Sequence, residues 1–122
     1  MANCLVTGGC GFIGSHIVDK LVELGHKVKV IDDESASENE EFYYNPNARY
    51  YKLDISKDDC SYCFGGDDGL PMDYVFHLAA RSRIQPTIGS PNECFEVNVV
   101  GTQRVLEWSR LNGIKRVIYS GT

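Results

Sequence analysis

A glycine-rich segment near the start of the chain has the residue types and the spacing to hold a phosphate group. Residues 7–14 read TGGCGFIG, which places G-x-G-x-x-G at positions 9, 11 and 14 and G-x-x-G-x-x-G at positions 8, 11 and 14. Such a turn needs residues free to take positive φ, and a pyrophosphate lying on the backbone leaves no space for a Cβ atom. The N–H groups and the positive dipole end of a helix beginning near Phe12 would then face the anion.

An acidic residue further along extends this prediction to a dinucleotide. Asp32 closes the next β-branched run and follows Gly14 by 18 positions, close to the separation of about 20 expected for the residue that binds an adenosine ribose. A carboxylate there accepts hydrogen bonds from ribose hydroxyls and repels a 2′-phosphate, and no arginine follows before Arg49. NAD is therefore predicted in preference to NADP. Asp33 and Glu34 continue the acidic turn, and both also suit a solvated turn without a ligand.

The elements that must position these residues alternate between strand and helix. Short runs rich in β-branched and aromatic residues predict strands at 3–7, 27–32, 50–53, 74–77 and 116–119. Apolar residues at helical spacing predict helices at 12–24 and 90–111, with Gly25 and Gly113 as their stops. Ser90 opens the second helix as the first residue of an S-x-x-E capping box.

This alternation sets the fold class. Strand, helix, strand units with short connections predict parallel strands joined by right-handed crossovers, hence an α/β fold: a doubly wound parallel sheet of the Rossmann type, with five strands. Residues 34–47 are expected to be mostly loop, and 56–73 to hold at most a short helix. Because doubly wound dinucleotide folds usually have six or more strands, the sheet is expected to be truncated after the fifth, with residues 1–122 forming one incomplete NAD-binding domain.

Composition narrows the partners. The chain is 43% hydrophobic and 24% charged, and its formal net charge of -5 does not favour nucleic acid or an anionic membrane. It has no run of about 18 apolar residues and no N-terminal signal peptide, so no membrane span or export is predicted. Five cysteines, an odd number, fit reduced thiols in the cytoplasm. Cys60 and Cys63 have C-x-x-C spacing without a second ligand pair, so free thiols and no metal site are expected, a metal or redox site being the alternative.

Several segments together resemble one known family. They are TGGCGFIG at 7–14, Asp54-Ile55, HLAA at 77–80, NVVGT at 98–102 and RVIYSGT at 116–122. In this order and spacing they are similar to the extended short-chain dehydrogenase/reductases, in particular the NAD-dependent epimerase/dehydratase group that acts on nucleotide sugars. The loop that follows HLAA is more similar to that of UDP-sugar 4-epimerases than to that of 4,6-dehydratases.

The glycine turn, the acidic pair and the resemblance together give the predicted cofactor-binding residues: Gly8, Gly11, Phe12, Ile13, Gly14, Asp32, Asp33, Asp54, Ile55, Leu78, Ala79, Ala80, Ser82 and Asn98. The resemblance implies that Phe12 and Ile13 lie along the pyrophosphate. It also implies that Asp54 accepts from the adenine amino group and that Ile55 packs on that ring. The small residues after the fourth strand would let the cofactor cross the sheet edge, and Asn98 would face it from the long helix.

Some of these residues have simpler interpretations, which stay open. Asp54 would equally suit a strand-end turn, and Asn98 a solvated helix face. Arg81 and Arg83, which flank Ser82 in the loop that lies near the nicotinamide ribose and the sugar diphosphate in relatives, are either anion clamps or solvated charges. His77 is interpreted as a packed core histidine without a catalytic part.

The chain departs from the family in its catalytic residues. Family members have a hydroxyl residue after the fifth strand and a Tyr-x-x-x-Lys pair further on, whose tyrosine removes a sugar hydroxyl proton while hydride passes to the nicotinamide. Thr122 falls on the hydroxyl position and is the predicted catalytic residue. None of the seven tyrosines is followed by a lysine four positions later, and the substrate-binding lobe is absent, so these 122 residues are expected to be inactive alone.

The sequence therefore predicts the N-terminal NAD-binding portion of a nucleotide-sugar epimerase or dehydratase. The resemblance implies a UDP-glucose 4-epimerase-like enzyme that acts on a UDP-sugar by transient oxidation at C4 and is a homodimer when full length. Two alternatives stay open: a stand-alone, non-catalytic NAD-binding module, and an NAD(P)-linked reductase of the same fold.

Overall fold

The structure is a computed structural model that describes residues 2–8, 12–33, 44–65, 71–78 and 99–119. Its strands are β1 (Asn3–Thr7), β2 (Lys27–Ile31), β3 (Ala48–Tyr51), β4 (Tyr74–His77) and β5 (Arg116–Tyr119). They form one sheet in the order β3-β2-β1-β4-β5, and every neighbouring pair is parallel. The prediction of a five-stranded, doubly wound parallel sheet is confirmed.

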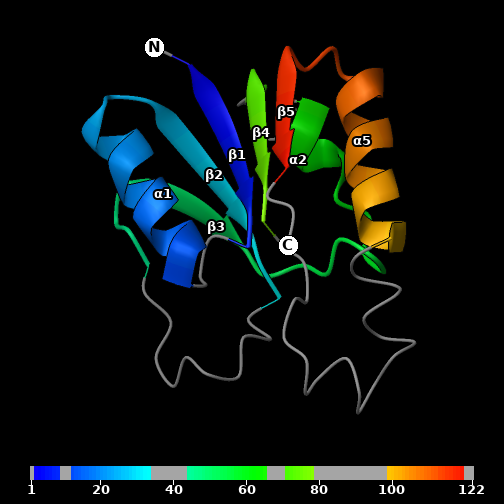
Figure 1. Cartoon of the computed structure of the whole chain (residues 1–122), viewed down its shortest axis with the longest axis horizontal. Helices are drawn as coiled ribbons and strands as arrows, with labels where there is room; N and C mark the ends of the chain where they lie inside the picture. The colour runs from blue at the N-terminus through cyan, green and yellow to red at the C-terminus, as the bar shows by residue number, and fades with distance from the viewer. Residues whose placement is uncertain (1, 9–11, 34–43, 66–70, 79–98, 120–122) are drawn as a thin grey trace.

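In the part of the chain that the structure describes, three helices cover the two faces of this sheet (Figure 1). Helix α1 (Phe12–Glu23) lies on one face, while α2 (Ser61–Gly65) and α5 (Gly101–Leu111) lie on the other. The two glycines predicted to stop the helices follow α1 and α5 with φ of 90° and 65°, a backbone conformation that glycine adopts without strain. No helix in the described residues is long and apolar enough to cross a membrane.

One strand boundary differs from its prediction. The third strand was predicted at 50–53 but spans Ala48–Tyr51, because β2 supplies partners only from Val28 to Ile31 and its register ends opposite Tyr51. The aromatic run at 50–51 dominated the sequence pattern, whereas pairing with β2 sets the strand ends. The predicted start of the long helix, with the Ser90 capping box, lies outside the described residues.

The core has two layers, one on each face. Val6 and Val30 point to the α1 face and pack with Val18 of that helix. Leu5 and Ile31 point to the other face, toward the α2 and α5 layer. Successive residues of β1 and β2 are thus buried on opposite sides, as expected for a parallel sheet covered by helices on both faces.

A fully buried lysine occupies the second layer, which the sequence did not predict. Lys29 in β2 is 0% exposed, and its Nζ donates a hydrogen bond to the carbonyl oxygen of Cys63 in α2 at 2.8 Å. The same ammonium lies 5.9 Å from the ring centroid of Tyr51. The contact joins β2 to helix α2 and satisfies a carbonyl near the C-terminal end of that helix.

Replacing this lysine tests how much the contact stabilises the fold. Lys29→Ala removes the buried side chain beyond Cβ and leaves the Cys63 carbonyl without its donor, so we expect the free energy of unfolding to fall by roughly 2–4 kcal/mol. Urea denaturation measures the change. Lys27→Ala, an exposed lysine of the same strand, is the matched control and should change stability by less than about 0.5 kcal/mol. Equal effects of the two substitutions would contradict this role for Lys29.

Candidate cofactor-binding site

The predicted cofactor-binding residues that the structure describes gather at one edge of the sheet. Gly8 follows β1, Asp32 follows β2 and Leu78 follows β4, and parallel strands all end at the same edge. The chain runs outward from β1 to β2 and β3, then returns to the other side of β1 for β4 and β5. In such sheets, ligands bind beyond the carboxyl ends at this reversal of strand order, which here lies between β1 and β4.

Gly8, the first glycine of the glycine-rich segment, leaves β1 with the positive φ that such a turn requires. Gly8 has φ of 80°, which an L-residue with a side chain rarely adopts, and its N–H donates to the Ile31 carbonyl at 2.8 Å. Helix α1 begins at Phe12, and Gly14 in its first turn is buried, as close packing of helix on strand requires. Ile13 is 62% exposed beside this turn. Its predicted contact with the pyrophosphate stays a prediction.

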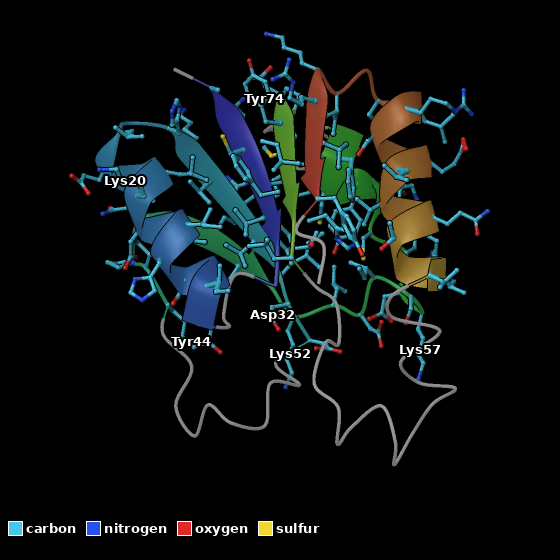
Figure 2. The ribbon with its side chains drawn as sticks, in the orientation of Figure 1. Lys20, Asp32, Tyr44, Lys52, Lys57 and Tyr74 are labelled. Carbon is cyan, nitrogen blue, oxygen red and sulfur yellow. The ribbon has the colours of Figure 1, made fainter. Side chains whose placement is uncertain are left out.

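Asp32 and Asp33 follow β2, and the side chains of both are partly exposed. Figure 2 labels Asp32 at this end of the strand. The Asp32 N–H donates to the Tyr51 carbonyl at 3.1 Å, and its carbonyl accepts from the Leu53 N–H at 3.2 Å. These two bonds place the backbone of Lys52 beside Asp32. The sequence pattern typical of NADP binding has an arginine near the ribose position, so this lysine was not predicted to lie there.

Asp54 forms a turn of the kind that the simpler interpretation predicted. Its Oδ1 accepts from the Ser56 N–H at 2.8 Å and from the Ser56 hydroxyl at 2.6 Å. Its own N–H donates to Asp58 Oδ2 at 2.7 Å. Ile55, at 3% exposed, packs into the core layer formed with Ile31 and Val75. The predicted contacts of this pair with adenine stay predictions, and the structure leaves little of the Ile55 side chain to make one.

Helix α5 braces the Asp54 turn. Arg104 Nη2 donates to the Asp58 carbonyl at 2.5 Å, and the guanidinium carbon of Arg104 lies 4.6 Å from the ring centroid of Trp108. The sequence signal for this brace was weak, because an arginine on a helix most often faces solvent. The contact joins the loop after β3 to a helix that lies more than forty positions along the chain.

His77, at the end of β4, is buried as predicted, with 1% of its surface exposed. Its Nδ1 lies 2.7 Å from Thr7 Oγ1 and its Nε2 lies 2.8 Å from Thr102 Oγ1. Its ring also stacks on Tyr119 with the centroids 5.5 Å apart. Burial lowers the pKa of His77 to about 4, so the imidazole is neutral at neutral pH. The bonding of both ring nitrogens was not predicted.

The C-x-x-C pair belongs to the core. Cys60 and Cys63 are buried thiols that pack with Phe64 in the core layer on the α2 and α5 face. Burial, together with the neighbouring Cys63, raises the pKa of Cys60 to about 12. A protonated, buried thiol is a poor nucleophile and a poor metal ligand, which favours the free-thiol interpretation.

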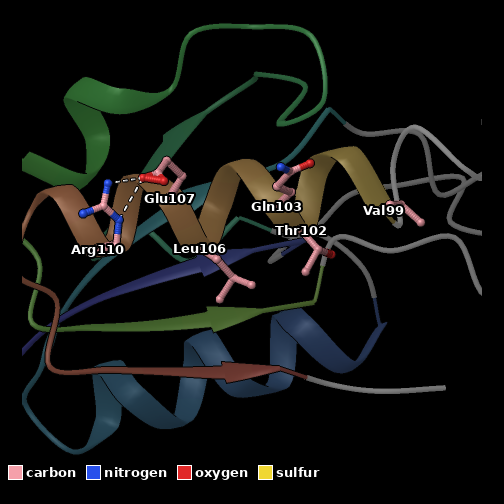
Figure 3. A pocket seen from close by; sticks show the side chains of 6 residues that line it. All are labelled: Val99, Thr102, Gln103, Leu106, Glu107 and Arg110. Atoms are coloured by element: carbon pink, nitrogen blue, oxygen red, sulfur yellow. Dashed lines mark hydrogen bonds and ion pairs between the residues drawn. The ribbon is translucent and has the colours of Figure 1, made fainter.

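The remaining predicted site residues lie outside the described part of the chain and stay predictions: Gly11, Ala79, Ala80, Ser82, Asn98 and Thr122, with the flanking Arg81 and Arg83. A depression of about 530 Å³ runs along one side of α5 and contains none of the predicted cofactor-binding residues (Figure 3). It is lined by Val99, Thr102, Gln103, Leu106, Glu107 and Arg110.

Comparison with known proteins decides the family. A sequence model of the NAD dependent epimerase/dehydratase family matches residues 4–122. The chain belongs to this family. The resemblance to the NAD-dependent epimerase/dehydratase group is thereby confirmed, and so is NAD as the cofactor on which the family depends.

The relatives of this epimerase/dehydratase family member include several 4-epimerases. The UDP-glucose 4-epimerase of Mycolicibacterium smegmatis is 35% identical over 125 residues, covering 97% of this chain and 38% of that protein. The solved UDP-glucose 4-epimerase of Thermotoga maritima with UDP-glucose superposes with a TM-score of 0.85 at 38% identity, covering 98% of this chain and 38% of that one. The Thermus thermophilus UDP-glucose 4-epimerase in complex with NAD gives 0.84 at 30% identity, covering 98% and 37%. The chain therefore spans between a third and two fifths of the length of these relatives.

The buried imidazole at the end of β4 predicts a specific pH dependence of stability. Unfolded His77 takes up a proton near its ordinary pKa of 6.5, whereas the folded state does so only near pH 4. Stability should therefore fall as the pH drops from about 6.5 to 4, by at most about 3 kcal/mol, and this loss should level off below pH 4. Urea denaturation at several pH values measures the dependence, with His77→Asn as the comparison. If both proteins lose the same stability over this range, other groups account for the loss.

Proposed function

We propose that this chain binds NAD at the carboxyl edge of its sheet and forms the cofactor-binding part of a nucleotide-sugar epimerase of the UDP-glucose 4-epimerase type. The observation that carries the proposal is the meeting of a positive-φ glycine turn and an acidic strand end beside the reversal of strand order. Family membership and the 4-epimerases among the relatives support it.

In this proposal, the backbone holds the pyrophosphate and a carboxylate holds the adenosine. Gly8, Gly11 and Gly14 let the pyrophosphate approach the N-terminus of α1, where free N–H groups and the helix dipole face it. The Asp32 carboxylate accepts from the ribose hydroxyls, with Asp33 beside it, and Asp54 faces the adenine. Phe12, Ile13, Ile55, Leu78, Ala79, Ala80, Ser82 and Asn98 complete the proposed contacts.

The cofactor, when bound, supplies a hydride acceptor and donor for a sugar carbon. The chain's own part is to bind and orient it so that the nicotinamide lies where the fourth and fifth strands end. Thr122 would offer a hydroxyl to the reacting sugar there, and Arg81 and Arg83 would hold the sugar diphosphate. We propose a UDP-sugar as the substrate and a homodimer as the assembly of the complete enzyme.

The proposed adenosine contact is tested by cofactor titration of the 122-residue chain. We expect tighter binding of NAD than of NADP, because the Asp32 carboxylate repels a 2′-phosphate. Asp32→Ala removes a charged acceptor, so NAD binding should weaken about tenfold. Asp32→Ala should also bring the affinities for NAD and NADP closer together, because it removes the charge that repels the 2′-phosphate. Glu23→Ala, at the far end of α1, is the matched control and should change neither affinity. Tighter binding of NADP by the unaltered chain would instead favour an NADP-linked reductase.

A turnover assay separates cofactor binding from catalysis. We expect the 122 residues to bind NAD but not to interconvert UDP-glucose and UDP-galactose, because they contain no Tyr-x-x-x-Lys pair to move the sugar hydroxyl proton. Product is followed by chromatography against a control without protein. Steady epimerisation above that control would show that other residues of this chain carry out the proton transfer.

A further inference from the structure

Three side chains form a continuous hydrogen-bonded path at the ends of β1 and β4. Thr7 ends β1, His77 ends β4, and Thr102 lies in the first turn of α5. The imidazole lies between the two hydroxyls, 2.7 Å from Thr7 Oγ1 and 2.8 Å from Thr102 Oγ1. In Figure 3, Thr102 extends from α5 toward the strands. The path joins two strands and a helix that are separated by 70 and 25 positions in the chain.

The path leaves neither ring nitrogen unsatisfied. A neutral imidazole carries one N–H and one lone pair, so in either tautomer one nitrogen donates to a threonine and the other accepts from one. Thr7 Oγ1 also accepts from the Leu78 N–H at 3.0 Å, and the Thr7 carbonyl accepts from the same N–H at 3.0 Å. The single residue Thr7 therefore fixes both the His77 ring and the backbone that continues from β4.

Two members of this path adjoin residues of the proposed cofactor site. Thr7 precedes Gly8, and His77 precedes Leu78. A dinucleotide that lies across the carboxyl edge must find the ends of β1 and β4 at a fixed separation. Ladder hydrogen bonds set the spacing of the strands, but both strands end at these residues, and beyond them only side chains and loop backbone can hold the chain in place.

We propose that His77 is a positioning residue that, through Thr7 and Thr102, locks the ends of β1 and β4 to the start of α5 and so presents Gly8 and Leu78 to the dinucleotide. The imidazole touches no reacting atom in this arrangement. It acts through the two threonines. We call the hydrogen-bonded ends of β1 and β4, together with the start of α5, the locked frame. The part of this inference that concerns the dinucleotide rests on the proposed function, whereas the locked frame itself does not.

The mildest test removes one hydroxyl at a partly exposed position. Thr102→Val is isosteric and breaks only the link between His77 and α5. We expect Thr102→Val to weaken NAD binding about tenfold, as measured by calorimetric titration. The separate variant Thr102→Ser keeps the hydroxyl and should bind NAD as tightly as the unaltered chain. Two further variants each keep one of the two hydrogen bonds of His77. His77→Asn keeps an amide group near the position of Nδ1, which faces Thr7, and His77→Gln keeps an amide group near the position of Nε2, which faces Thr102. Both should bind NAD more weakly than the unaltered chain.

The control separates positioning from general stability. Val105→Ala empties a fully buried position one turn further along α5 without touching the path, so it should lower the unfolding midpoint but leave the NAD affinity within about twofold. Equal weakening by Val105→Ala and Thr102→Val would overturn the proposal, because affinity would then follow stability. NAD affinity of Thr102→Val within twofold of the unaltered chain would also overturn it.

Hydrogen exchange gives a readout that needs no cofactor. The amide of Leu78 donates to Thr7, and its exchange rate is compared with the exchange rates of the β1 amides in the same protein. In Thr102→Val this ratio should rise about tenfold, whereas in Val105→Ala it should not change. If the unaltered chain fails to bind NAD, the proposed function fails, and this measurement alone then decides on the frame. Faster relative exchange at Leu78 would still support a locked frame, and unchanged exchange would overturn it.

Discussion

Parallel hydrogen bonding on both sides of β1 is the constraint on which the rest of the structure depends. Because β2 and β4 both run parallel to this strand, all three end at one edge, and residues seventy positions apart become neighbours there. Parallel neighbours also need crossover connections, and the helices that the structure describes cover both faces of the sheet and bury successive residues of β1 and β2 on opposite sides. Helices cover the two faces of the sheet, so a partly exposed polar side chain such as Asp32 lies at its carboxyl edge. The glycine turn has its functional meaning only because β1 is central and the chain changes direction beside it.

Helix α5 acts on this edge as a second organising element. Thr102 reaches the end of β4 through His77, and Arg104, two residues later, holds the turn that follows β3 through the Asp58 carbonyl. The helix thus touches both flanks of the proposed cofactor site from its first two turns. Neither contact is an ion pair. Both are hydrogen bonds to groups whose positions the sheet has already fixed, so they add rigidity without the desolvation cost of a buried charge pair.

The polar groups at the carboxyl edge of the sheet suit a ligand with an anionic pyrophosphate and an adenosine ribose that carries no 2′-phosphate. The proposed pyrophosphate contact uses backbone N–H groups and a helix dipole, which require glycine rather than lysine or arginine. The proposed adenosine contact uses Asp32, whose charge opposes a 2′-phosphate. The Asp32 carboxylate, and not the glycine motif, would therefore set the choice between NAD and NADP in this member of the epimerase/dehydratase family.

The order of strands and helices and the glycine spacing of the turn could be predicted from the sequence. The β-branched runs, the stops at Gly25 and Gly113 and the glycine spacing after β1 are local features, since backbone propensity and steric freedom act within a few residues. Contacts between segments that are distant in the chain became visible only in the tertiary structure. Pairing with β2 moved the third strand to Ala48–Tyr51, and packing buried Lys29 against the Cys63 carbonyl. His77 reads in the sequence as an ordinary core residue, and only the meeting of two strand ends with a helix gives both its nitrogens a partner. Contacts between distant segments depend on register and packing, which no local pattern encodes.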